Sequence, residues 1–153
     1  MKILVATDGT EHSREALDAV LNINLSDGDE IKIISVIDMA IPPAVDLYGG
    51  FLPPTSEFET AVRSNIEKIV EEARRHLQDK IFNDKIHISI ETPSGSPESR
   101  IVETAEEMNA DLIVVGSHGY NRWERLLLGS VSDSVVHHAH CSVLVVRSKE
   151  KHL

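Results

Sequence analysis

The chain alternates between short apolar runs and longer segments with helical periodicity. Two uninterrupted apolar runs, at 3–6 and 112–115, predict strands that are buried on both faces. Further strands are predicted at 31–37, 86–90 and 143–146. Between the strands, apolar residues recur at steps of three and four, which predicts helices over 11–24, 58–77, 97–109 and 130–138.

Two helix starts carry recognisable capping residues. Thr10 is placed to cap the first helix, and Glu11 adds negative charge to its first turn. Ser96 suits the cap of the third helix, and Pro97 suits its first position, where a missing N–H costs nothing. The sequence therefore predicts helices that begin at residues 11 and 97.

Strands that alternate with helices predict one α/β domain over 1–153, with a parallel sheet covered by helices on both faces. Ligands of such sheets bind at the carboxyl ends of the strands, where the strand order reverses. Three polar or glycine-containing segments follow predicted strands, at 7–8, 36–38 and 116–119. If the first and fourth strands are neighbours at the reversal, these segments converge on one site.

The net charge of the chain limits the classes of molecule that it is expected to bind. Fifteen Lys and Arg against twenty-five Asp and Glu give a net charge of −10, which repels a phosphate backbone and disfavours nucleic-acid binding. The apolar residues 1–6 are too few for a signal peptide or a membrane span. Cys141 is the only cysteine, so no intrachain disulfide is possible. We expect a cytoplasmic protein.

The segment after the fourth apolar run has the spacing Gly-x2-Gly-x9-Gly-Ser, with glycines at 116, 119 and 129. Gly116 and Gly119 can adopt positive φ and let the backbone approach a ligand. The N–H groups of Ser130, Val131 and Ser132 would lie free at a helix N-terminus, which suits phosphate. The hydroxyls of Ser130 and Ser132 would add donors.

Two other segments offer what the rest of a nucleotide needs. Asp8 is placed to accept hydrogen bonds from ribose hydroxyls or to support a metal ion through water, and the backbone of Val36 could read an adenine edge. The alternative is that these glycines are turn residues and that serine is an ordinary helix cap. Neither the Walker phosphate loop nor the dinucleotide-binding fingerprint is present.

The combined pattern resembles the universal stress protein family, in its ATP-binding branch. The resemblance extends from Ile3 to Arg147. It rests on the opening ILVATDGT, on SVID at 35–38, on GSP at 95–97, on DLIVVGSHG at 111–119, on LGSVS at 128–132 and on CSVLVVR at 141–147. The family's ATP signature is Gly-x2-Gly-x9-Gly-Ser/Thr, which this sequence satisfies without a gap.

The resemblance implies a doubly wound, three-layer fold with the strand order 3-2-1-4-5, a homodimer paired through the last strand (Ser142 to Arg147), and ATP bound with Mg²⁺. It implies a stress-response sensor or regulator with a protein partner that the sequence does not name. A slow ATPase, or a protein that phosphorylates itself on Ser130 or Ser132, is the alternative. Matched by position, the binding residues would be Ala6, Thr7, Asp8, Val36, Val115, Gly116, His118, Gly119, Gly129, Ser130, Val131 and Ser132.

Two further features have competing interpretations. His137, His138, His140 and Cys141 look like a metal cluster, but we expect them to close the last helix, where His complements the helix dipole. The proline-rich segment 38–55 carries apolar residues that suit a lid or a partner site, although a docked loop is the more ordinary interpretation. We expect neither a metal site of protein ligands nor a catalytic residue in this chain.

Overall fold

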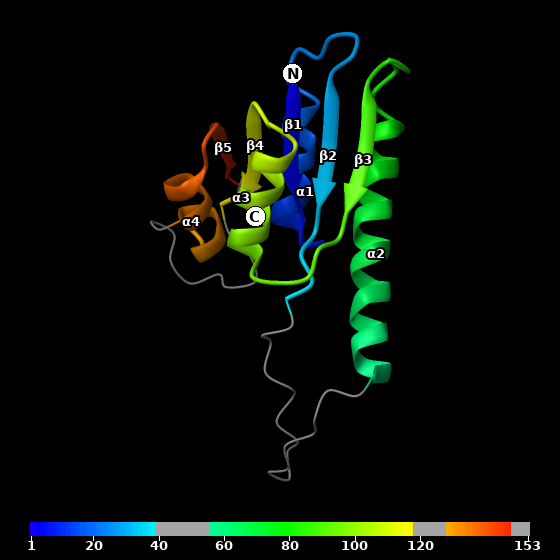
Figure 1. The fold of residues 1–153 in the computed structure, drawn as a ribbon. Helices are drawn as coiled ribbons and strands as arrows, with labels where there is room; N and C mark the ends of the chain where they lie inside the picture. Colours follow the sequence, from blue (N-terminus) through cyan, green and yellow to red (C-terminus); the bar gives the residue numbers. More distant parts are fainter. Residues whose placement is uncertain (39–55, 118–127, 148–153) are drawn as a thin grey trace, which may run out of the picture.

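The structure, a computed structural model of the chain, describes residues 1–38, 56–117 and 128–147. In these ranges the chain forms a five-stranded parallel sheet in the order β3-β2-β1-β4-β5 (Figure 1). The strands are β1 (Lys2–Ala6), β2 (Glu30–Ile34), β3 (His87–Glu91), β4 (Leu112–Gly116) and β5 (Ser142–Val146). The predicted parallel sheet and its strand order are confirmed.

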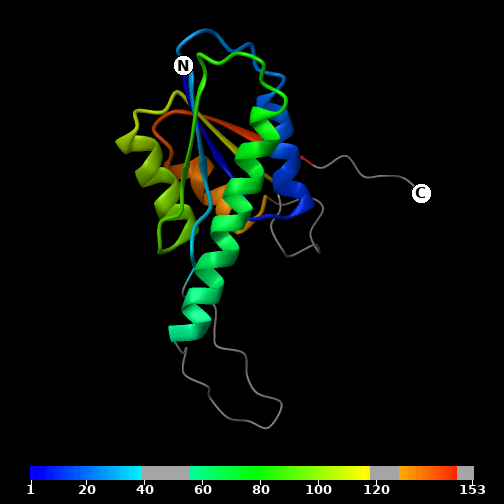
Figure 2. The ribbon, with the colours of Figure 1, turned by 90° about the vertical axis from the view of Figure 1, so that its right-hand side faces the viewer.

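Four helices of the described ranges cover both faces of this sheet. They are α1 (Glu11–Val20), α2 (Ser56–Gln78), α3 (Pro97–Glu107) and α4 (Ser130–His138). Figure 2 shows α1 and α2 on one side of the sheet and α3 and α4 on the other. Each face has its own hydrophobic core, with Val5 and Ile33 buried beneath α1 and α2, and Leu4 and Ile113 on the side of α3 and α4.

The strands differ in burial according to their place in the sheet. The central strands β1 and β4 are almost wholly apolar, and their three middle residues are buried. The edge strands β3 and β5 are half-buried or exposed, with Ile90 and Leu144 at 40% and 38% exposure. Strands buried on both faces need apolar residues at every position, which is why the uninterrupted runs marked the centre of the sheet.

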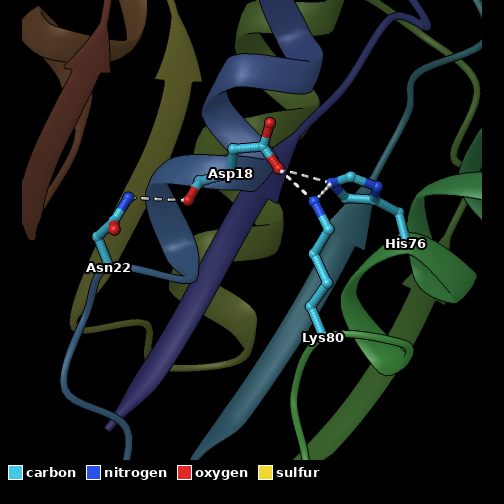
Figure 3. Close-up of polar contacts among 4 residues, drawn as sticks. All are labelled: Asp18, Asn22, His76 and Lys80. Atoms are coloured by element: carbon cyan, nitrogen blue, oxygen red, sulfur yellow. Dashed lines mark hydrogen bonds and ion pairs between the residues drawn. The ribbon is translucent and has the colours of Figure 1, made fainter.

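The first helix is shorter than predicted, because it ends at Val20 and not at residue 24. Asn22 donates from Nδ2 to the carbonyl of Asp18 at 3.1 Å (Figure 3), so its side chain occupies the acceptor that its own N–H would use in a continuing helix. The Asn22 N–H bonds instead to Ala19 at 3.1 Å. This competition closes the helix in a turn.

The second strand also ends early, at Ile34, where 31–37 was predicted. The Thr7 N–H donates to the Ile34 carbonyl at 2.9 Å, and the chain of β1 then turns into α1, so β2 loses its neighbour on that side. On the other side Ile37 still forms an isolated bridge with Ser94, but the intervening Pro93 has no N–H to donate. The ladder is therefore interrupted.

The predicted helix starts are confirmed at Glu11 and Pro97, but the third helix ends at Glu107 and not at 109. Asn109 has φ of 52°, the left-handed conformation that commonly follows a helix and that Asn tolerates. None of the helices in the described ranges combines the length and apolar character needed to cross a membrane. Of the proline-rich segment, residues 39–55 lie outside the described residues.

Candidate functional site

The strand order reverses between β1 and β4, which are neighbours in the sheet. Val5 aligns with Val114 across this pair, and Ala6 aligns with Ile34 on the other side of β1. The carboxyl ends of β1, β2 and β4 therefore lie side by side at the same edge. The segments 7–8, 36–38 and 116–119 were expected to converge if the first and fourth strands were neighbours at the reversal, and these strands are neighbours.

The loop from β1 to α1 holds Asp8 with one of its oxygens engaged. Asp8 Oδ1 accepts hydrogen bonds from Thr10 N at 2.9 Å and Thr10 Oγ1 at 2.5 Å. Thr10 Oγ1 in turn accepts from Ser13 N at 3.3 Å, which confirms Thr10 as the helix cap. Asp8 Oδ2 accepts no hydrogen bond from any described residue, so this half-buried carboxylate keeps one oxygen for an outside donor.

The buried side chain of Thr7 stabilises the same loop through hydrogen bonds. Its side chain is 7% exposed, and its Oγ1 accepts from Gly9 N at 3.3 Å and shares a 3.0 Å hydrogen bond with Ser13 Oγ. Ser13 Oγ also donates to the Thr10 carbonyl at 3.0 Å. The hydroxyl of Thr7 is thus engaged within the protein, and it fixes the loop that carries Asp8.

Val36 lies at the carboxyl end of β2 with its backbone open. Its neighbours are paired, because Ser35 N donates to the Glu91 carbonyl at 3.2 Å and Ile37 N to the Pro93 carbonyl at 2.8 Å. No backbone group of the described residues bonds to the N–H or C=O of Val36. The arrangement leaves one donor and one acceptor side by side, which is what an adenine edge requires.

The apolar residues of the predicted site share one cluster. Val115 is buried in the core beneath α3 and α4, and Ala6, Val36 and Val131 pack against that core while remaining partly exposed. They come from β1, the end of β2, β4 and α4. The structure therefore brings these four residues, which are far apart in the sequence, to one end of the sheet.

The start of α4 is fastened to the end of β4. Ser117 N continues the ladder to the Val146 carbonyl at 2.8 Å, and the Ser117 carbonyl accepts from Gly129 N at 2.8 Å. Ser132 Oγ donates toward the Gly129 carbonyl at 2.9 Å and the Ser117 carbonyl at 3.3 Å. These bonds place the N-terminus of α4 directly beyond the carboxyl end of β4.

That N-terminus has no side-chain cap. The cap residue is Gly129, and the first backbone bond of the helix runs from Asp133 N to the Gly129 carbonyl at 2.8 Å. The N–H groups of Ser130, Val131 and Ser132 therefore have no acceptor within the helix, and together they carry the positive end of its dipole. The geometry suits an anion.

Two expectations about this segment are corrected. The hydroxyl of Ser132 is not a free donor, because the side chain is 3% exposed and its one proton is directed at protein carbonyls. Gly116 does not have positive φ. A Cβ at this position would lie 3.2 Å from the carbonyl oxygen of His12, so Gly116 is needed where the first turn of α1 crosses β4.

Among the described glycines that follow β1 or end β4, Gly9 has positive φ, at +80° between Asp8 and Thr10. Gly9 was not among the residues predicted for the site. The signal available was its place in the first strand-to-helix turn, where a left-handed residue is common. His118 and Gly119, both predicted binding residues, lie outside the described residues.

The histidines near the end of α4 behave as predicted for a helix end. His137 and His138 are in its last turn, and each Nδ1 lies 2.8 Å from the carbonyl four residues earlier. Ala139 is extended, so Cys141 does not share a helical face with His137. Burial raises the pKa of the Cys141 thiol. Within the described ranges, no three His, Cys, Asp or Glu side chains gather as a metal site would require.

Comparisons with known proteins give consistent results. The family model described as Universal stress protein family matches residues 1–147. Universal stress protein MJ0531 of Methanocaldococcus jannaschii is 35% identical over 150 residues, which cover 98% of this chain and 84% of that protein. Among solved structures, hypothetical protein MJ0577 has a TM-score of 0.80 and 27% identity, over 98% of this chain and 97% of that one. A universal stress protein in complex with cAMP has a TM-score of 0.64 and 26% identity, over 95% of both chains.

Proposed function

Because the chain belongs to the universal stress protein family, we propose that it is an ATP-binding member acting as a dimeric cytoplasmic regulator of the stress response. The observation that carries the proposal is the uncapped N-terminus of α4, held by Ser117 at the strand-order reversal. Its free N–H groups, together with Gly129 and the glycine spacing, suit the phosphates of a nucleotide. Binding would bias which conformation a protein partner meets.

The remaining parts of a nucleotide have counterparts around this terminus. The open backbone of Val36 suits adenine, and the apolar surface of Ala6, Val36 and Val131 suits the face of the base. The free oxygen of Asp8 suits a ribose hydroxyl or the hydration shell of Mg²⁺, a hard ion that prefers oxygen ligands. Most of the ligands of that ion would come from the phosphates.

The similar structure solved with cAMP supports a nucleotide ligand for this fold, but it does not tell how many phosphates the ligand of this chain carries. The triphosphate is proposed because the sequence satisfies the family's complete ATP signature, which ends at the uncapped start of α4. AMP and cAMP are the ligands that a test must compare with ATP.

Thermal unfolding with and without Mg·ATP tests the proposal, with AMP, cAMP and GTP as comparisons. Ligand at one hundred times its Kd stabilises a fold by about 2.7 kcal/mol, which for a chain of this size raises Tm by about 5–10 °C. The sample is also denatured and its supernatant analysed for nucleotides, because bound ligand that co-purifies would mask the shift. No shift, together with no nucleotide in the supernatant, would refute ATP binding.

The proposed homodimer pairs the β5 strands of two copies, over Ser142 to Arg147. Among the described residues, β5 is paired with β4 alone, so its outer edge is open there, and Leu144 is 38% exposed. Open edges of this kind pair readily with another strand. Light scattering should give the mass of two chains for the native protein and of one chain for Leu144→Asp. A native mass of 16.9 kDa would exclude the dimer.

The structure also bears on the alternative, a slow ATPase or a self-phosphorylating protein. The buried hydroxyl of Ser132 is directed at the Gly129 carbonyl, which disfavours it as a phosphate acceptor, whereas Ser130 is exposed. Incubation with γ-labelled ATP distinguishes the two serines. If the protein becomes labelled, and the label is lost in Ser130→Ala but kept in Ser132→Ala, self-phosphorylation is favoured. If the protein is not labelled and releases no phosphate, the alternative is refuted and the regulatory function is retained.

A further inference from the structure

Helix α2 is anchored at only one of its ends. All of its buried residues, Val70, Ala73 and Leu77, lie in its C-terminal half. No residue from Ser56 to Lys68 is buried, and Figures 1 and 2 show this N-terminal half projecting beyond the carboxyl ends of the strands. The helix therefore has a docked half and a projecting half.

The docked half is also bonded to α1. Asp18 Oδ1 lies 2.6 Å from His76 Nε2 and 3.3 Å from Lys80 Nζ, and Figure 3 shows both α2-side groups pointing at the same carboxylate. Lys80 follows α2 by two residues. The C-terminal end of α2 is thus held to α1 by polar contacts as well as by the core.

Between the two halves, α2 contacts the loop that carries Asp8. A Cβ at Gly9 would lie 2.8 Å from Ile69 Cδ1 and 3.0 Å from Ile69 Cγ1, and the three atoms nearest to it all belong to Ile69. Gly9 also has φ of +80°, which other residues rarely adopt, so a side chain here would be strained as well as pressed against Ile69. Gly9 separates Asp8 from Thr10, whose N–H and hydroxyl orient the carboxylate. Ile69 therefore packs directly on the loop of the proposed nucleotide site.

The contact has room to change. A pocket of about 60 Å³ adjoins it between α1 and α2, lined by Thr7, Gly9 and Thr10 of the loop and by Leu17, Ile69 and Ala73 of the helices. A side chain packed on every side would resist displacement, whereas the pocket beside Ile69 leaves the side chain and the loop space to move together.

We propose that Ile69 is a positioning residue for Asp8, and that its contact with Gly9 makes the projecting half of α2 report whether the nucleotide site is occupied. This inference rests on the proposed function. A ligand that fixes the Thr7–Thr10 loop fixes Ile69 and with it the helix. By reciprocity, the factor by which nucleotide favours the fixed form of α2 is the factor by which that form binds nucleotide more tightly than the unfixed form.

The matched variants are Ile69→Ala and Ile66→Ala. Both remove the same atoms from half-buried positions of α2, but the atoms nearest to Gly9 belong to Ile69. Hydrogen exchange of residues 7–10 and 56–68 and calorimetric titration with Mg·ATP are measured on both. In the absence of nucleotide, we expect faster exchange at Thr10 in Ile69→Ala alone. We expect its Kd for ATP to rise about fivefold, the lower end of typical couplings.

With nucleotide, exchange over 56–68 should slow in the native protein and in Ile66→Ala and remain unchanged in Ile69→Ala. A double-mutant cycle guards against simple misfolding. Gly9→Ala should weaken ATP binding more when Ile69 is present than when position 69 is alanine, because the steric conflict is then removed.

Two kinds of failure are distinguishable. If the native protein binds ATP and Ile69→Ala matches it in affinity and in the exchange of α2, the inference is wrong and the proposed function stands. If the native protein gives no heat with ATP, no thermal shift and no nucleotide in the supernatant of the denatured sample, the proposed function fails and the reporting role fails with it. The exchange at Thr10 without nucleotide tests separately whether Ile69 positions the loop.

Discussion

The helices that begin at the strand-order reversal, α1 and α4, have opposite kinds of N-terminus. The start of α1 is closed, because Thr10 accepts from Ser13 N and Asp8 accepts from Thr10 N. The start of α4 has glycine as its cap residue and no side-chain hydrogen bond to its first N–H groups. At α1 the cap side chain accepts a hydrogen bond from a first-turn N–H, whereas at α4 no side chain does so.

This difference indicates which part of a ligand each N-terminus would attract. The closed terminus places a carboxylate beside the reversal, which repels phosphate and attracts hydroxyl donors or cations. The open terminus presents N–H groups and the positive end of a dipole, which attract phosphate. A nucleotide laid across both would have its sugar toward Asp8 and its phosphates toward Ser130. The comparison is tested by variants that give the N-terminus of one helix the charge or the missing cap of the other.

The largest effect is expected for Ser130→Asp, which gives the open terminus the negative charge of the closed one. A carboxylate in the first turn stabilises a helix, typically by 0.3–1 kcal/mol, so Tm should hold or rise slightly. The same charge would repel the phosphates, and we expect ATP affinity to fall more than 100-fold, about 2.7 kcal/mol. Calorimetric titration and thermal unfolding measure the two effects.

The control is Ser134→Asp, which adds the same charge to the same helix one turn further from its N-terminus. Its ATP affinity should change less than threefold. Equal losses in the two variants would mean that net charge, and not the open terminus, governs binding.

The next effect concerns Gly116, which supports the closed terminus from below. A Cβ there would meet the His12 carbonyl at 3.2 Å, and this neighbour is backbone that cannot rotate away. Gly116→Val should therefore force α1 away from β4 and cost about 3 kcal/mol, the upper end of the range for overpacking. Urea unfolding measures the loss. Gly28→Val is the comparison, since nothing lies within 4 Å of a Cβ at that position, although its φ of +85° adds strain of its own.

Gly116 also shows what sequence patterns resolve and what they do not. The pattern identified a glycine at the end of a buried strand, whereas the strand order was implied by the family resemblance. It did not distinguish a glycine that approaches a ligand from one that admits a helix, because the deciding atom belongs to His12, more than a hundred positions away. The same holds for Gly9, whose partner Ile69 comes from another helix.

Local chemistry was easier to predict than competition between neighbours. The cap at Thr10 and the proline start at Pro97 follow from single residues, and both are confirmed. The end of α1 depended on whether the Asn22 side chain or its backbone would take the Asp18 carbonyl. The hydroxyl of Ser132 similarly had a choice between ligand and carbonyl. Sequence gives the residue types in such cases, and packing decides the partner.

A smaller effect is expected for Thr10→Ala, which opens the closed terminus without adding charge. The variant loses the hydrogen bond to Ser13 N and the one donated to Asp8. Loss of such a cap costs about 1 kcal/mol, which lowers Tm by about 3 °C in a chain of this size. Thr60→Ala is the control, because within the described ranges the Thr60 hydroxyl bonds to the Ser56 carbonyl alone, on an exposed turn. Equal Tm values for the two variants would contradict the capping role of Thr10.

The smallest effect is expected at the C-terminal end of α1, which also differs from the corresponding end of α4. The last turn of α4 has His137 and His138, whereas the last turn of α1 has no basic residue and contains Asp18. A carboxylate near a helix C-terminus is unfavourable, but His76 and Lys80 of the α2 side bond to it. Partial burial raises the pKa of Asp18, and these hydrogen bonds outweigh that effect, so the pKa lies below its ordinary value.

A lowered folded-state pKa gives stability that is present above the unfolded pKa, about 4 for Asp, and is lost as pH falls through the folded value. The native protein should therefore exceed Asp18→Asn in unfolding free energy near pH 6, and the difference should shrink as the pH falls below about 4. Because the Asp18 side chain is 46% exposed, solvent screening limits the difference to a few tenths of a kcal/mol. Urea unfolding between pH 3 and 6 measures it, with Asp84→Asn as the control, since exposed Asp84 has no ion pair among the described residues. A difference that persists unchanged at pH 3 would show that Asp18 acts through shape and hydrogen bonding alone, and that α1 needs no compensating charge at its end.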